Sequence, residues 1–256
     1  MALLEGKKAL IFGVANHRSI AWAIAQSLAN EGAQLVLAYQ ERMERYVRDL
    51  AAKIPGTELV LCDVQDDDQL DKAFAKTSDV FGGELDMLIH CVAFAPPSEL
   101  ENPFVDTTRA GFHTALDISS YSLIAMAKRA QPLMKANGGS ILTLTYMASG
   151  RVMPKYNVMA VAKAALECSV RYLAYELGEH NIRVNAISAG ALNTLAARGI
   201  SSFTDFRQHT ATVAPLHRNI EQSEVGDTAL FLCSNYARGI TGEVLFVDAG
   251  YNIMGM

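Results

Sequence analysis

The sequence predicts an α/β fold, in which helices cover both faces of one doubly wound parallel sheet of about seven strands. Short apolar, β-branched runs alternate with longer segments of helical period along all 256 residues. The short runs are apolar at consecutive positions, as expected for strands that are buried on both faces. Because no linker rich in proline, glycine or serine divides the chain, we expect a single domain spanning residues 1–256.

Seven runs are predicted as strands. They are KKALIF at 7–12, QLVLAY at 34–39, ELVLC at 58–62, LDMLIHC at 85–91, SILTLT at 140–145, IRVNAIS at 182–188 and EVLFVD at 243–248. Segments between them, such as SIAWAIAQSLANEG, have apolar residues three and four positions apart, which is typical of helices. Right-handed crossovers make the strand order reverse near the first strand, and ligands of such sheets bind beyond the carboxyl ends of the strands there. We therefore expect functional residues where strands end.

Composition and charge exclude several classes of protein. Half of the residues are apolar, and the net charge of −5 with scattered basic residues argues against nucleic acid as a partner. No apolar run approaches the roughly 18 residues that span a bilayer, and MALLEGKKALIF lacks the cleavage site of a signal peptide. We expect a cytoplasmic protein without membrane insertion. The four cysteines and six histidines show no metal-ligand spacing, so we expect no metal.

The first and third strands are each followed by a candidate cofactor contact. In FGVANHRSIAWAIA, Gly13 permits a tight turn, and Ser19 is placed to cap a helix whose N–H groups favour a pyrophosphate. The loop lacks the full GxGxxG pattern, and an ordinary strand-to-helix turn is the alternative. After the third strand, Asp63 and Val64 are placed to meet an adenine, or Asp63 only caps the next helix. The position in the first βα unit favours a Rossmann-type dinucleotide site.

The end of the second strand bears on the choice of dinucleotide. Gln40 and Glu41 lie where such folds contact the adenosine ribose, and a carboxylate there repels a 2′-phosphate. This favours NADH over NADPH. Arg42 and Arg45 oppose that preference if they turn inward, whereas on a solvated helix face they have no bearing on it.

The stretch YMASGRVMPKYNVMAVAK, which follows the fifth strand, contains a candidate proton site. Pro154 is placed to start a helix, and Tyr156 and Lys163 are seven residues apart, so they share one helix face about 10 Å apart. We expect the ammonium to lower the pKa of the phenol and to hold a nicotinamide ribose. Tyr146 ends the strand and faces the same cleft. The alternative is that the tyrosines are core residues with hydrogen-bonded hydroxyls.

These motifs resemble a known family. The stretches YNVMAVAK, GVANHRSIA, HCVAFAP, DISSYSL, RVNAISAG and GITGEVLFVDAGY resemble bacterial NADH-dependent enoyl-acyl carrier protein reductases, a divergent branch of the short-chain dehydrogenases/reductases. The resemblance covers nearly the whole chain. It is specific, because most of the larger family places its catalytic tyrosine and lysine four positions apart, whereas this branch uses the seven found here.

The resemblance implies a reaction in fatty acid biosynthesis. NADH delivers hydride to a trans-2-enoyl thioester held by acyl carrier protein, and Tyr156 donates a hydrogen bond to the thioester oxygen. Lys163 orients the ribose, and Tyr146 matches the family's second tyrosine. Positions that match the family's dinucleotide contacts are Gly13, Ser19, Ile20, Gln40, Asp63, Val64, Ala93, Lys163, Leu192 and Thr194.

A substrate lid is expected at residues 191–210. The residues predicted to line the acyl site, or alternatively to belong to the core, are Phe94, Ala95, Tyr146, Tyr156, Met159, Ile200, Phe203 and Phe206. The family is commonly tetrameric, and the apolar tail VDAGYNIMGM suits burial between subunits, so a homotetramer is expected.

Two departures from the family pattern affect the same region. At 191–193 the family usually has Pro, Ile and Arg, whereas this chain has Ala, Leu and Asn, which alters the loop beside the cofactor. At 201, 204 and 205 the family often has basic residues for docking the carrier protein, and here stand Ser, Thr and Asp. Arg198 and Arg207 are candidates to replace them.

Two rival functions remain from the sequence. One is a related reductase that acts on a ketone or alcohol, against which the seven-residue spacing and Tyr146 argue. The other is a non-catalytic dinucleotide sensor, which would be expected to have lost Tyr156 or Lys163.

Overall fold

A computed structural model describes residues 2–194 and 203–255 of the chain. One sheet of seven parallel strands has the order β3-β2-β1-β4-β5-β6-β7. The strands are β1 (Lys8–Phe12), β2 (Gln34–Tyr39), β3 (Glu58–Leu61), β4 (Met87–His90), β5 (Gly139–Thr145), β6 (Ile182–Ala189) and β7 (Val244–Val247). Because β1 pairs with both β2 and β4, the order reverses at the first strand, as predicted.

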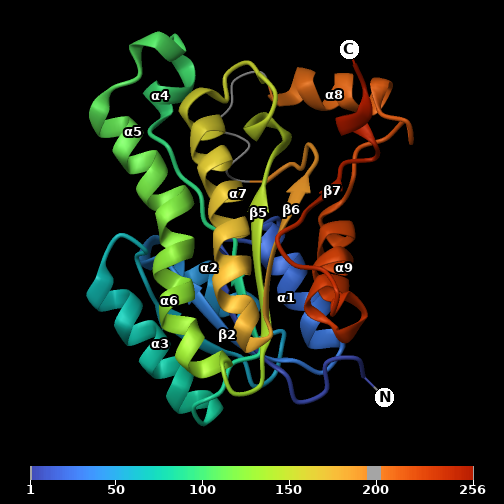
Figure 1. Ribbon diagram of the computed structural model, residues 1–256. Coiled ribbons are helices and arrows are strands. Elements are labelled where there is room, and N and C mark those ends of the chain that lie inside the picture. Colours follow the sequence, from blue (N-terminus) through green and yellow to red (C-terminus); the bar gives the residue numbers. More distant parts are fainter. Residues whose placement is uncertain (1, 195–202, 256) are drawn as a thin grey trace.

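Helices cover both faces of this sheet. They are α1 (Ile20–Asn30), α2 (Glu44–Ala51), α3 (Asp67–Phe81), α4 (Pro97–Glu101), α5 (Arg109–Leu116), α6 (Ser122–Met134), α7 (Asn157–Leu177), α8 (Phe203–Val213) and α9 (Gln222–Cys233). In Figure 1, α6 and α7 lie in front of the sheet and α1 lies behind it. The helices α4, α5 and α8 lie at the end toward which β6 points, which is the carboxyl end of all the strands.

Alternate strand residues form two apolar cores. On β1, Ile11 packs in the core that contains α1, α2 and α9, whereas Leu10 packs in the core that contains α3, α6 and α7. Both side chains have no exposed surface, and burying such a side chain stabilises the fold by about 1.5–3 kcal/mol. Strands buried on both faces explain why the predicted runs are apolar at consecutive positions.

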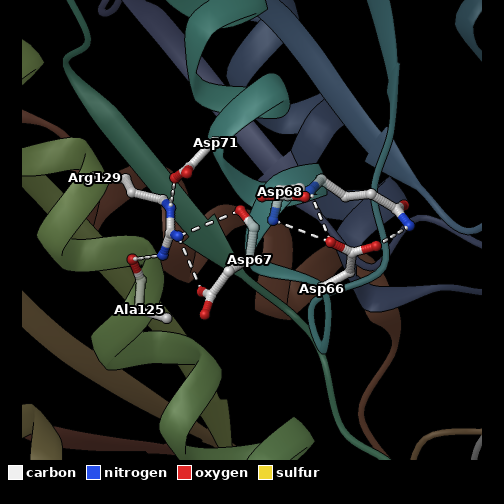
Figure 2. Close-up of polar contacts among 7 residues, drawn as sticks. Asp66, Asp67, Asp68, Asp71, Ala125 and Arg129 are labelled. Atoms are coloured by element: carbon white, nitrogen blue, oxygen red, sulfur yellow. Dashed lines mark hydrogen bonds and ion pairs between the residues drawn. The ribbon is translucent and has the colours of Figure 1, made fainter.

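A partly buried arginine ties α3 to α6 on one face of the sheet. Figure 2 shows Arg129 of α6 reaching two carboxylates of α3. Its Nε lies 2.6 Å from Oδ1 of Asp71, and its Nη2 lies 2.9 Å from Oδ1 of Asp67. A third donor, Nη1, bonds the carbonyl oxygen of Ala125 at 3.1 Å. These charge-assisted bonds fix α3 and thereby the loop before it, which follows β3.

Most predicted strands differ from the structure by one residue at one or both ends, and three differences are larger. Strand β4 is shorter than the predicted 85–91, and it begins later because the N–H of Leu85 bonds the carbonyl of Leu133 in α6 and not a neighbouring strand. Helix α7 begins at Asn157 and not at Pro154, because Lys155, with φ 65°, interrupts the helical backbone between them. Residues 203–213, partly expected as a lid connection, form α8, and Ile200 lies outside the described residues.

Two kinds of feature are absent from the described residues. None of their helices is both long and apolar enough to cross a bilayer. Nor do the same residues include a group of three or more His, Cys, Asp or Glu side chains placed to hold a metal ion.

Candidate active site

The loop after β1 requires glycine at its first position. Gly13 has φ +99°, and a Cβ built there would lie 2.1 Å from the carbonyl oxygen of Cys91, which follows β4. No side chain fits such a contact without moving the backbone. Gly13 therefore lets the exits of β1 and β4 lie side by side at the reversal of strand order.

Ser19 occupies the N-cap position of α1 but does not cap the helix with its side chain, so that part of the prediction is wrong. Its Oγ instead accepts from the backbone N–H groups of Ala15 and Asn16, at 3.0 and 2.9 Å. The hydroxyl thus organises the loop, and it leaves the N–H groups of Ile20 and Ala21 for another acceptor, whereas the N–H of Trp22 bonds the Ser19 carbonyl at 3.1 Å. A helix N-terminus with unfilled donors fits a pyrophosphate group.

Side-chain hydrogen bonds within the following turns fix the chain where β2 and β3 end. The Oε1 of Gln40 accepts two bonds from Arg42, at 3.1 and 2.8 Å, so Arg42 is drawn back along its own turn. Asp63 does not cap α3: its Oδ1 accepts from the N–H of Gln65 at 3.1 Å. The cap is Asp66, whose carboxylate accepts two N–H groups of the first turn (Figure 2). Val64 packs against the core.

The exit of β4 is held by a serine that the sequence argument missed. The N–H of Phe94 donates to Oγ of Ser119 at 3.0 Å, and the same hydroxyl donates to the carbonyl of Phe94 at 3.2 Å. Ser119 lies in a π-helical turn, residues 117–121, between α5 and α6. Ala93 and Phe94 are exposed here, whereas Ala95 is buried. A π-turn often marks a functional site, and DISSYSL was the available signal.

The two phenols of the predicted proton site lie together. Tyr146 follows β5, Tyr156 precedes α7, and their ring centroids are 4.9 Å apart. The backbone around Tyr156 is strained, because Lys155 and Asn157 have φ of 65° and 42°. The Nδ2 of Asn157 donates to three carbonyls in residues 99–102, the shortest at 2.8 Å, and Lys155 Nζ bonds another at 2.9 Å. These contacts hold Tyr156 against α4.

Burial decides the protonation of both phenols. It raises the pKa of Tyr156, and it raises the pKa of Tyr146 together with nearby Tyr156, Tyr251 and Asp248. The expectation that Lys163 lowers the pKa of Tyr156 is wrong for this structure. At neutral pH both hydroxyls therefore carry a proton and can donate a hydrogen bond.

Lys163 is buried, with 5% of its surface exposed. Its Nζ donates to the carbonyl oxygen of Leu144 in β5 at 2.7 Å. Burial lowers its pKa from 10.5 to about 8, so the side chain is still mostly charged at neutral pH. The helix thus places a desolvated cation beside the end of β5, where Tyr146 follows.

His90 forms a buried polar network behind the phenols. Its Nδ1 lies 2.8 Å from Oγ1 of Thr143, and its Nε2 lies 2.8 Å from Oγ of Ser122. Both hydroxyls also donate to carbonyls, that of Ser122 to Ile118 at 2.6 Å and that of Thr143 to His90 at 3.2 Å, so each is able to accept a bond from the ring. Burial, followed by the charge of Lys163, lowers the pKa of His90 to about 3, so the imidazole is neutral. From the sequence, only a structural or surface role was expected for His90.

The side of the site near α8 is aromatic. Phe206 packs edge-on against Tyr146 and Tyr251, with centroid distances of 6.5 and 5.8 Å. The Nε of Arg207 donates to the carbonyl oxygen of Ala191 at 3.2 Å, so α8 is tied to the segment after β6. That segment contains buried Leu192 and a bond from the N–H of Thr194 to the carbonyl of Leu192 at 2.8 Å.

The structure brings most predicted site residues to one end of the sheet. Met159 and Ala95 are buried in a small apolar cluster against which Tyr156 packs. Ile200 lies outside the described residues, and nothing is described of the Phe203 side chain. The cluster, the phenol pair and Phe206 thus supply apolar surface beside two proton donors.

Known proteins are similar to this chain in both fold and sequence. A family model described as Enoyl-(Acyl carrier protein) reductase matches residues 13–252. An NADH-dependent enoyl-acyl-carrier-protein reductase from Nostoc sp. is 52% identical over 260 residues, 100% of each chain. One from Aquifex aeolicus is 49% identical over 257 residues, 100% of this chain and 95% of its own. The Bacillus cereus enoyl-acyl carrier protein reductase with NADP+ and indole naphthyridinone has a TM-score of 0.97 at 50% identity, with 100% of both chains covered.

Proposed function

The chain belongs to the family of enoyl-(acyl carrier protein) reductases, and from that premise we propose that Tyr156, Tyr146 and Lys163 carry its reaction. It is an NADH-dependent oxidoreductase that reduces the trans-2 double bond of an enoyl thioester in fatty acid biosynthesis. The substrate is carried by acyl carrier protein. The roles of single residues, the subunit number and the location in the cytoplasm are our proposals.

The dinucleotide fits the exits of β1, β2 and β3. The uncapped N–H groups of α1 suit its pyrophosphate, Gln40 suits the adenosine ribose, and Asp63 with Val64 suits the adenine. When bound, NADH supplies the hydride that reduces the double bond. Arg42 donates to Oε1 of Gln40, which brings a cation to this turn, so the preference for NADH over its 2′-phosphate form rests on the neighbouring carboxylate of Glu41.

Tyr156 acts as a hydrogen-bond donor to the thioester oxygen. Reduction at the β-carbon places negative charge on that oxygen, and a fixed donor in a site of low dielectric stabilises the charge. A phenol whose pKa is raised by burial keeps its proton for this purpose. Tyr146, 4.9 Å away between ring centroids, limits the positions that the Tyr156 ring can take.

Lys163 positions the cofactor by charge and hydrogen bonding. One of its three N–H donors is used by Leu144, and the others suit ribose hydroxyls. Phe206, Met159, Ala95 and Phe94 exclude water from the acyl chain, and the described parts of the predicted lid are residues 191–194 and α8. Arg207 is an anchor of that lid through Ala191, which adds to the carrier-docking role first considered for it.

The observation that carries this proposal is the close pair of phenols, with rings tilted at 54° and centroids 4.9 Å apart, at the end of the strand that buried Lys163 contacts. A ketone reductase needs a proton donated directly to the substrate oxygen, and a second tyrosine has no part in that step. Purified protein should oxidise NADH with crotonyl thioester and not with a β-ketoacyl thioester, as followed by loss of cofactor absorbance. Oxidation with only the ketone would overturn the proposal.

Two separate apolar surfaces support a homotetramer. Tyr172 and Tyr175 of α7 are 69% and 86% exposed, and Ile124 of α6 lies beside them at 40%. On the far side, Leu245 and Phe246 of the edge strand β7 are 40% and 44% exposed. Two such surfaces give two kinds of two-fold contact, as a tetramer needs. Light scattering should give four subunits for the native chain and two for Tyr175→Glu.

A further inference from the structure

Helix α7 is joined to the end of β5 by two hydrogen bonds that lie one helical turn apart. Lys163 Nζ donates to the carbonyl oxygen of Leu144 at 2.7 Å. Four residues later on α7, Oε1 of Glu167 accepts from the hydroxyl of Thr145 at 2.6 Å. Leu144 and Thr145 are consecutive, and Tyr146 comes next. The two bonds therefore fix α7 against the two residues that precede Tyr146 of the phenol pair.

The charges around Lys163 single out the same carboxylate. The titratable groups that face this ammonium are Cys91 and His90 at the end of β4 and Glu167 on its own helix. Burial raises the pKa of Cys91 to about 12 and lowers that of His90 to about 3, so both are neutral near pH 7. The Tyr156 hydroxyl is neutral as well. Glu167 is then the one anion among the described residues that raises the pKa of Lys163.

We propose that Glu167 is a positioning residue, whose carboxylate fixes the end of β5 through Thr145 and keeps the buried ammonium of Lys163 charged. It touches neither of the phenols and acts through its two neighbours. A carboxylate one turn from a buried lysine stabilises the cation, and the Thr145 bond holds the carboxylate in place. This inference rests on the proposed role of Lys163 in holding NADH.

The test measures NADH dissociation constants and kcat from about pH 6 to about pH 10 in matched variants. In the wild type, NADH affinity falls as pH rises through the pKa of Lys163, near 8. Glu167→Gln keeps an oxygen for Thr145 but removes the charge, so this fall should begin at lower pH. At pH 8 its NADH affinity should be about fivefold weaker.

Thr145→Val separates the hydrogen bond from the charge. In this variant, NADH affinity should still fall at about the same pH as in the wild type. Its kcat should be about tenfold lower, because the end of β5 loses a charge-assisted bond. Thr145→Ser should restore kcat. Glu176→Gln, an exposed carboxylate on the same helix, should match the wild type in both measurements.

The outcomes separate this inference from the proposed function. If Lys163→Met keeps the pH-dependent fall, another group holds NADH and the role of Lys163 fails. If Lys163→Met abolishes the fall while Glu167→Gln leaves it at the wild-type pH, the role of Lys163 stands and that of Glu167 is overturned. A loss of kcat in Glu167→Gln without movement of the fall equally overturns it, because packing alone explains that result.

Discussion

The two sides of the site are built differently. The adenosine side, at the exits of β1, β2 and β3, relies on backbone groups, a glycine and exposed turn residues. The phenol side, at the exits of β4 and β5 with α7, relies on side chains held by buried polar partners. A large, flexible cofactor binds even when the groups that contact it are positioned with modest precision. Stabilising the charge on a single oxygen requires a donor that is held firmly in one position. The contrast predicts that substitutions on the two sides change different quantities.

The largest change in rate is expected on the phenol side. Tyr156→Phe removes the donor to the thioester oxygen and keeps the ring packed, so kcat should fall about 100-fold to 1,000-fold. Tyr236→Phe, an exposed tyrosine, is the matched control. Steady-state reduction of crotonyl thioester with NADH measures both. A kcat within about twofold of wild type in Tyr156→Phe would remove the phenol from the reaction.

The adenosine side is most sensitive at Gly13. A Cβ in Gly13→Ala meets the carbonyl of Cys91 at 2.1 Å and requires φ +99°, so the free energy of unfolding should fall by about 3 kcal/mol or more. Gly56→Ala is the control, because Gly56 also has positive φ, +80°, but nothing lies within 4 Å of its Cβ. Its loss should be about 1 kcal/mol. If urea denaturation gives equal losses of unfolding free energy for the two variants, the contact with the Cys91 carbonyl does not restrict the residue at position 13.

His90 makes the phenol side sensitive to acid. Its pKa is lowered from 6.5 to about 3, so below pH 6.5 the unfolded chain binds a proton that the folded chain does not. Stability from this group is present above pH 6.5 and is lost as pH falls, by about 2 kcal/mol at pH 5. Unfolding free energies of wild type and His90→Gln at pH 7 and pH 5 give this difference. The pKa of His90 is also measurable by NMR in the wild type, which does not require the variant to fold. A titration midpoint near pH 6.5 would contradict the prediction.

The smallest effect is expected at Ser19. Ser19→Ala loosens the loop before α1, so the NADH dissociation constant should rise about fivefold while kcat changes by less than about twofold. Ser223→Ala, an exposed serine in α9, is the control. If Ser19→Ala instead lowers kcat and leaves NADH binding intact, the two sides are not divided as described.

The sequence predicted the framework of both sides, because strand and helix period are local properties. All seven strand runs were found, and β2 matches its predicted limits of 34–39. Gly13 was predicted at the right turn, since only glycine tolerates such a backbone. The phenol pair was predicted from spacing and from the rule that parallel strands end at one edge.

What the sequence did not reveal are partners far apart in the chain. Ser19 was placed at the helix start, but the direction of its hydroxyl depends on loop geometry. Lys163 was expected to act on Tyr156, yet its bonded partner is a backbone carbonyl, which no residue type encodes. The partners of His90 lie 32 and 53 residues away, so no local pattern joins them. The raised pKa of both phenols was not predicted either, because it results from burial, which depends on the packed fold and not on local sequence.

The division between the two sides is tested most directly by titrating NADH into Tyr156→Phe and following cofactor fluorescence. We expect a dissociation constant within about twofold of the wild type, even though turnover is nearly lost, because the adenosine side and Lys163 are unchanged. An NADH affinity that falls as far as kcat would contradict this division and would make Tyr156 a cofactor-binding residue.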